Sequence, residues 1–249
     1  MRPKYLVVVL WVWILSGCGS GGSGGSGDAV PPDTGPTIAI YKFDETSGAA
    51  VVNSVQNRFN GSIYGASRVA GKVANALQFG VAGSRAEIPM SSLTPMSPPM
   101  VFTTGEISID TWIRLDTPGT FYHLIGSGYW GLKSFRLGLG NGQVQFMVYD
   151  SSAWRPVIAS NQTLAPNIWY HIALTYNGST GKIYINGMED ATNTISYVVP
   201  TSYNTLFIGA TENGNFGFES EFQGTMDEIR LFRVTLSASQ VLDYYNSTK

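Results

Sequence analysis

The 249-residue sequence contains a single cysteine, Cys18, and only two histidines, His123 and His171. One cysteine cannot form an intramolecular disulfide, and with two histidines it does not make a thiolate or multi-histidine zinc site. Charged residues are also scarce, at 13%, and the formal net charge is −2. Because lysine and arginine do not cluster beyond the N-terminus, we expect no sequence-independent binding to nucleic acid.

The composition favours strands and turns over helices. Glycine occurs 29 times and tyrosine 13 times, and 43% of the residues are hydrophobic. Glycine supplies turns and tyrosine is enriched in strands. Once the N-terminal segments are set aside, roughly 210 residues remain, a length that suits one β-sandwich or two small domains.

The N-terminus has the pattern of an export signal. Positively charged Met1–Lys4 precedes an apolar run, Tyr5–Leu15, that is short for a membrane span. The run ends in Leu-Ser-Gly-Cys at positions 15–18, which resembles the bacterial lipobox. The resemblance implies that residues 1–17 are a signal peptide and that Cys18 is lipidated. The alternative is an ordinary cleaved signal with an incidental cysteine.

Residues 18–36 are expected to be a tether. Gly19–Gly27 is a Gly/Ser tract without side chains for a core, and Asp28–Pro36 adds three stiffening prolines. Gly19 follows the cysteine, in place of the aspartate associated with inner-membrane retention. The resemblance to lipoproteins therefore favours an exported protein at the outer membrane or cell surface, touching the membrane only through its lipid anchor.

Residues 37–249 show the period-2 alternation of strands separated by Gly, Asn and Pro turns. In the clearest strand one face carries Ile107, Ile109, Thr111, Ile113 and Leu115, and the other carries Glu106, Ser108, Asp110, Trp112 and Arg114. Asn186-Gly187 predicts a type I′ hairpin. One helix is expected at the C-terminus, capped by Ser237 with Gln240, its apolar face made of Ala238, Val241, Leu242 and Tyr245. This pattern predicts an all-β, two-sheet sandwich.

Several segments in order resemble the laminin-G-like domain of bacterial surface proteins. These are Ile40–Gly48, Phe59–Gly61, Gly71–Phe79, Ile107–Ile113, Trp169–Tyr176, Ile183–Gly187 and Phe222–Arg230 with Leu236-Ser237. The resemblance covers residues 37–249 and implies an antiparallel, concanavalin A-like jelly roll. Asn53 and Asn186 stand where the family often has aspartate, which weakens a metal assignment at the first position and removes a charge at the second.

Two carboxylates from opposite ends of this domain are candidate calcium ligands. Asp227 shares strand parity with Ile229 and Leu231, which predicts an inward-facing carboxylate that needs a cation or several donors. Asp44 follows the first expected strand. Lectin-like sandwiches often carry structural calcium at a comparable place, and calcium takes six to eight oxygen ligands. The alternative is that both carboxylates accept backbone N–H bonds.

A ligand surface is expected on one face of the sandwich. In this fold ligands usually lie in the concave sheet or on its rim, where aromatic rings stack on sugars. The candidate ligand-binding residues are Tyr129, Trp130, Arg136, Tyr149 and Trp154. The alternative is that these side chains fill the core between the sheets.

Catalysis has one candidate, the strand Glu106-Ile-Ser-Ile-Asp110. Laminarinase-type glycosidases share the sandwich and carry Glu-x-Asp-x-Glu on one strand face, so Glu106 and Asp110 could flank a sugar bond. Ser108 replaces the central acid, and the last acid is shortened. A polar strand face in a solvated groove is the competing interpretation.

The leading functional hypothesis is therefore a non-enzymatic, lipid-anchored module that recognises carbohydrate or a glycosylated partner. The second is a structural or adhesive envelope protein that makes protein–protein contacts, and the third is a retaining glycoside hydrolase. Fold does not fix function, and the sequence leaves the three open.

Overall fold

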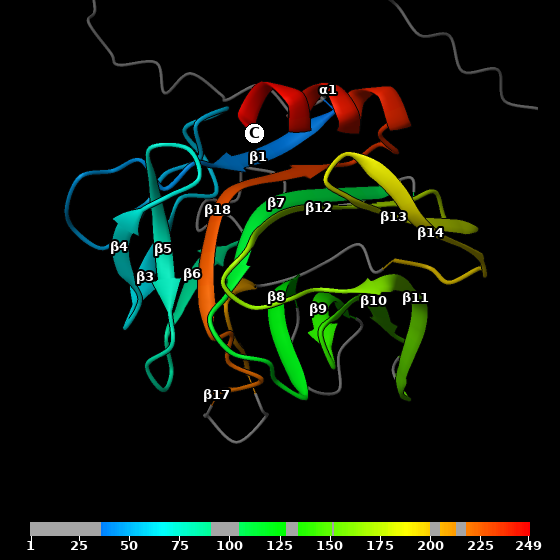
Figure 1. Cartoon of the computed structure of the whole chain (residues 1–249), viewed down its shortest axis with the longest axis horizontal. Helices are drawn as coiled ribbons and strands as arrows, with labels where there is room; N and C mark the ends of the chain where they lie inside the picture. Colours follow the sequence, from blue (N-terminus) through cyan, green and yellow to red (C-terminus); the bar gives the residue numbers. More distant parts are fainter. Residues whose placement is uncertain (1–35, 91–104, 128–133, 151, 200–204, 213–217) are drawn as a thin grey trace, which may run out of the picture. The chain divides into compact units, whose positions relative to one another are not determined.

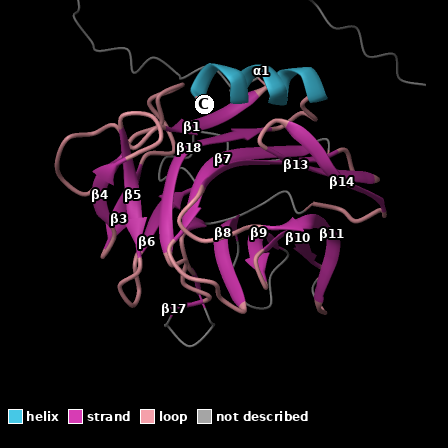
Figure 2. Cartoon of the chain, viewed as in Figure 1, coloured by secondary structure: helices cyan, strands magenta, loops and turns pink. Residues whose placement is uncertain are grey.

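The computed structural model describes residues 36–90, 105–127, 134–150, 152–199, 205–212 and 218–249. Within these ranges the chain forms two large antiparallel sheets, a two-stranded ribbon and a C-terminal helix (Figures 1 and 2). The predicted all-β sandwich is confirmed. No helix in the described ranges is both long and apolar enough to cross a membrane.

Sheet A has the strand order β14-β13-β12-β7-β18-β5-β4, and β1 also pairs with β18. Its strands are β1 (Thr37–Tyr41), β4 (Ser67–Ala70), β5 (Asn75–Phe79), β7 (Ile107–Leu115), β12 (Trp169–Tyr176), β13 (Thr180–Ile185), β14 (Met188–Thr194) and β18 (Gly224–Phe232). The first and last strands of the domain are thus hydrogen-bonded neighbours.

Sheet B has the order β11-β10-β9-β8-β15-β6-β3-β2. Its strands are β2 (Ala50–Val51), β3 (Gly61–Tyr64), β6 (Arg85–Pro89), β8 (Phe121–Ser127), β9 (Ser134–Gly140), β10 (Gln143–Tyr149), β11 (Trp154–Thr163) and β15 (Thr205–Ile208). The ribbon consists of β16 (Thr211–Glu212) and β17 (Phe218–Glu219).

The core lies between the sheets and follows the predicted alternation. Its members include Ile107, Ile109 and Ile113 of β7, Val144, Phe146 and Val148 of β10, and Ile172 and Leu174 of β12, all buried. The intervening residues point away from the core, as strand geometry requires. The hairpin between β13 and β14 is also as predicted, since Asn186 and Gly187 both have positive φ, 52° and 80°.

A β-bulge in β18 changes the face on which its residues lie. Asp227 pairs with Trp112 and Arg230 pairs with Asp110, so one residue more lies between the pairs on β18 than on β7. Glu228, at the bulge, has a φ of 51°. At this point β18 exchanges one neighbour for another, from β5 to β1.

Helix α1 (Ala238–Thr248) begins with the predicted capping box. Ser237 accepts from the Gln240 amide, and the Gln240 side chain accepts from the Ser237 amide at 2.8 Å. The predicted apolar face is partly wrong, because Ala238 is exposed, whereas Tyr244, which was not predicted, packs toward the sheet. Figure 1 shows α1 lying over β1, β18 and β7, on the outward face of sheet A.

Candidate functional site

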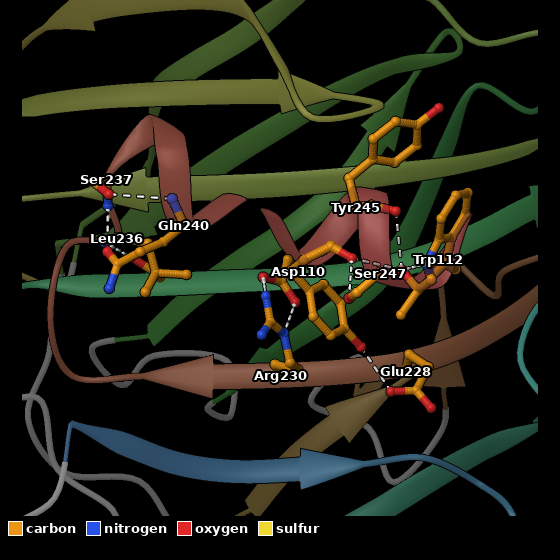
Figure 3. A network of polar contacts seen from close by, with 12 residues as sticks. Asp110, Trp112, Glu228, Arg230, Leu236, Ser237, Gln240, Tyr245 and Ser247 are labelled. Carbon is orange, nitrogen blue, oxygen red and sulfur yellow. Dashed lines mark hydrogen bonds and ion pairs between the residues drawn. The ribbon is translucent and has the colours of Figure 1, made fainter. Parts of the chain in front are cut away.

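Helix α1 covers the face of β7 that carries the candidate catalytic acids (Figure 3). The Trp112 indole N–H donates to Thr248 Oγ1 at 3.0 Å, and its ring lies 5.7 Å from that of Tyr245. Ser108, Asp110 and Trp112 are all buried. The expectation of a solvated groove along this strand face was therefore wrong, because a helix occupies the space over it.

Asp110 is held in an ion pair with Arg230 and has no exposed surface. The guanidinium donates to Oδ1 at 2.8 Å and to Oδ2 at 2.5 Å. Burial raises the pKa of Asp110 to about 6, although the hydrogen bond and charge of Arg230 lower it. Glu106, the other candidate acid, accepts from the backbone and hydroxyl of Thr235 at 3.0 and 3.2 Å. A sugar on the protein surface cannot reach the Asp110 carboxylate in this arrangement.

The same buried region contains an aromatic stack on the Arg230 cation. The guanidinium lies 3.1 Å from the ring centroid of Tyr244, whose hydroxyl donates to Glu228 at 2.7 Å. His171 lies against Tyr244 and Trp112, and burial lowers its pKa to about 3, so it is neutral at physiological pH. These contacts join β7, β12, β18 and α1, and their role is structural.

The outward face of sheet B carries the three described candidate ligand residues. Tyr149 and Trp154 lie directly opposite each other on β10 and β11, with ring centroids 5.4 Å apart. The Arg136 guanidinium lies 4.1 Å from the Trp154 ring centroid and 4.5 Å from that of Phe121. We call Phe121, Arg136, Tyr149 and Trp154 the aromatic cluster. Tyr129 and Trp130 lie outside the described residues.

These side chains do not fill the core, contrary to the alternative interpretation. The neighbours of Arg136 on β9, Phe135 and Leu137, are the core residues, and Tyr149 follows Val148 of the core. The cluster therefore lies on the opposite side of the sheet. Gly138 leaves room for the Phe121 ring, because a Cβ on that glycine would come within 2.9 Å of Phe121 Cζ.

Arg136 is the charged centre of the cluster. It is 9% exposed, and its Nε is buried without a hydrogen-bond partner among the described residues. Burial lowers the pKa of Arg136 to about 10, while the charge of Glu219 raises it. The side chain is therefore cationic at neutral pH, and two cation–π contacts, worth about 0.5–2 kcal/mol each, offset part of its desolvation.

The strand pairing shows that the outward face of sheet B extends from β10 across the sheet to β3. One row contains Met147, Arg136, Gly126, Phe207, Glu87 and Ser62. Further along, Arg85 lies 4.4 Å from the ring centroid of Tyr64 and 3.7 Å from that of Phe218, and pairs with Glu87 at 2.6 Å. Sequence reasoning missed this second group, because its members come from three short strands, β3, β6 and β17, that lie far apart in the sequence.

The two candidate calcium ligands meet at one turn. Asp227 Oδ2 accepts from the Val73 amide at 2.8 Å, and Asp44 Oδ1 accepts from the Asn75 amide at 3.2 Å. The predicted inward direction of Asp227 was wrong: the bulge at Glu228 resets the parity, and Asp227 lies on the face of Trp112, its cross-strand partner. Both carboxylates accept backbone N–H bonds, as the alternative interpretation expected.

One carboxylate oxygen there is unsatisfied. Asp227 Oδ1 is buried and forms no hydrogen bond of good geometry with a described residue. Burial raises the pKa of Asp227 to about 7, against the lowering effect of backbone N–H groups, chiefly that of Val73. Within the described part of the chain, no three His, Cys, Asp or Glu side chains gather into a metal-binding group.

Comparison with protein families identifies the superfamily of the chain. The model Laminin_G_3, described as "Concanavalin A-like lectin/glucanases superfamily", matches residues 90–242, more than half of the sequence. The chain belongs to this superfamily. No curated protein sequence matches it.

Solved structures of the superfamily fold are similar to this member at low identity. Domain 4 of AbnA, a GH43 extracellular arabinanase from Geobacillus stearothermophilus solved with arabinotriose, has 21% identity and a TM-score of 0.65, over 83% of this chain and 97% of that domain. Trypanosoma rangeli sialidase has 16% identity and a TM-score of 0.64, over 86% and 33%. The botulinum neurotoxin serotype D binding domain has 15% and 0.63, over 85% and 52%. This superfamily member thus spans about a third of the sialidase chain and half of the toxin domain, and these likenesses show the fold alone.

Proposed function

We propose that this superfamily member is a non-catalytic module that binds carbohydrate on the outward face of sheet B. The observation that carries the proposal is the aromatic cluster, in which three rings and a cation lie together on the side of the sheet away from the core. Sugar C–H faces stack on aromatic rings, and guanidinium N–H groups donate to sugar oxygens. The arabinanase domain, which has the same fold and was solved with arabinotriose, supports this use of the sandwich.

The test is a glycan array followed by calorimetry with bacterial and plant polysaccharides. Trp154→Ala should weaken binding of the best ligand at least about tenfold, since a stacked ring is lost (about 1.4 kcal/mol). Trp169→Ala is the matched control, because Trp169 is also partly exposed and has an arginine, Arg114, over its ring, but lies on sheet A. Absence of binding to every glycan on the array would reject the proposal and favour a module for protein–protein contacts.

The non-catalytic part of the proposal rests on Asp110. A glycosidase needs two carboxyl groups at the sugar bond, and this one lies under α1 in an ion pair. Release of reducing ends from β-glucans, abolished in Glu106→Gln, would overturn it.

The proposal places the module at the bacterial envelope, exported and attached through a lipid on Cys18, at the outer membrane or cell surface. The lipobox-like ending of the apolar run and the following Gly/Ser tether support this placement. Mass spectrometry of the mature N-terminus checks it, and an unmodified or absent Cys18 would refute the anchor.

Structural calcium is part of the same proposal. Asp44 and Asp227 would hold the ion together with backbone carbonyls and water, and the unsatisfied, buried Asp227 Oδ1 supports the fit. The ion would neutralise the buried carboxylate and tie the segment after β1 to the turn before β5 and to β18.

A further inference from the structure

Arg136 forms no ion pair with a described residue, whereas several other arginines of the domain do. Arg68, Arg85 and Arg230 each form an ion pair with a glutamate or aspartate at 2.5–2.9 Å. Arg136 forms no ion pair or hydrogen bond with any described residue. Its guanidinium instead lies against the rings of Phe121 and Trp154. A buried cation without an anion is costly, so its persistence in this place calls for an explanation.

Arg136 keeps its positive charge in these surroundings. Glu219 on β17 acts on Arg136 electrostatically but does not pair with it. His123, on the neighbouring strand β8, is neutral because burial and the charge of Arg136 lower its pKa to about 3. Among the described residues of the aromatic cluster, the positive charge is therefore that of Arg136, flanked by Phe121 and Trp154.

We infer that the aromatic cluster binds acidic carbohydrate, with a sugar carboxylate paired to the terminal nitrogens of Arg136 and the sugar ring stacked on Trp154 or Tyr149. This inference rests on the proposed function and names its ligand class. A planar guanidinium matches a carboxylate through two parallel hydrogen bonds. The rings beside it exclude water and strengthen the pair, and they supply the apolar surface that a sugar ring needs.

The test compares acidic oligosaccharides with their carboxyl-reduced forms on the purified full chain. The probes are oligomers of galacturonate, of mannuronate and guluronate, and of a glucuronate-containing polymer, each titrated by calorimetry beside its reduced counterpart. At least one acidic probe should bind about tenfold or more tightly than its neutral form, which corresponds to about 1.4 kcal/mol. The difference should shrink as salt is raised.

Variants of Arg136 test whether this residue causes the preference for acidic probes. Arg136→Gln should abolish the preference for the acidic probe, while Arg136→Lys should keep part of it. Arg155→Gln is the matched control, since Arg155 is a neighbouring arginine on β11 already paired with Asp150. Circular dichroism and thermal melting establish that each variant folds, and the comparison of probes on the wild-type chain needs no variant.

The outcomes separate this inference from the proposed function. If the reduced probes bind as tightly as the acidic ones or more tightly, the inference of an acidic ligand is wrong, whereas the proposal of carbohydrate binding stands. Absence of binding to any probe, together with a silent glycan array, overturns both. An acidic preference that survives Arg136→Gln also overturns the inference, because the carboxylate is then recognised elsewhere.

Discussion

At the scale of single residues, the titration of Asp227 links calcium to stability. The pKa of Asp227 is about 7 in the folded protein and near 3.8 in an unfolded chain, so the folded state holds this proton more tightly. Its contribution without calcium is therefore greatest below pH 4 and is lost as the pH rises from about 4 to about 7. A bound calcium ion needs the ionised carboxylate and reverses this trend.

We expect calcium to raise Tm by a few degrees at pH 8 and by much less at pH 5. Asp227→Asn should abolish the calcium effect. Buried His123 and His171, with lowered pKa values, act with the opposite sign, so the informative quantity is the difference between wild type and variant across pH. A chelator that leaves the wild-type Tm unchanged at pH 8 would refute the calcium site.

Asp227 is also an example of a residue whose side of the sheet could not be predicted from the sequence. Strand alternation correctly predicted the inward residues of β7, because nothing interrupts that strand. The same rule failed at Asp227, because the positive φ of Glu228 inserts an extra residue and no Gly or Asn signals it. Trp154 was chosen as a candidate because a large aromatic stood in a Gly- and Ser-rich connection, and its role in binding stays a prediction.

At the scale of elements, the Asp110–Arg230 pair joins β7, β18 and α1. Arg230→Met removes the guanidinium that lowers the pKa of Asp110, so the buried carboxyl group must either stay charged without a partner or take up a proton. We expect a loss of about 3–5 kcal/mol in the free energy of unfolding, measured with urea.

The matched control is Lys182→Met, which breaks the exposed pair with Glu189 on β13 and β14. That change should cost less than about 1 kcal/mol. A similarly small loss for Arg230→Met would contradict the stabilising role of the buried Asp110–Arg230 pair. The double variant Asp110→Leu with Arg230→Met should recover much of the loss, because no buried charge then remains.

The start of helix α1 could be predicted from the sequence, whereas its contact with sheet A could not. Its start was predictable because the capping box needs only Ser237 and Gln240, three residues apart. Its docking on Trp112 was not, because that contact joins residues 136 positions apart. The burial of Asp110, and with it the argument against a glycosidase, follows from that long-range contact.

At the scale of the molecule, β1 and β18 complete sheet A from the two ends of the domain. Deletion of residues 1–35 should leave Tm unchanged within about 2 °C, because every described strand is kept. Deletion of residues 1–41 removes β1 and leaves the second half of β18 without that neighbour. We expect Tm to fall by more than 10 °C or cooperative unfolding to be lost, as followed by circular dichroism. Two equally stable truncations would show that β1 is dispensable.

The two-layer architecture was predictable because each strand buries one face, which alternation reveals directly. The difference between the two outward faces could not be predicted, since it depends on where α1 lies. Residues of similar polarity on β7 and on β9–β11 thus have different surroundings, one set under a helix and the other on the outward face of sheet B.

The position of β18 also affects how the chain is made. This strand lies between β7 on one side and β5 and β1 on the other, yet it follows every other strand of the sheet along the chain. Until β18 has been synthesised, the two parts of sheet A have no common partner, and their edges remain open. The two parts of sheet A can therefore join only after residues 224–232 have been synthesised, whatever the order in which the earlier strands pair.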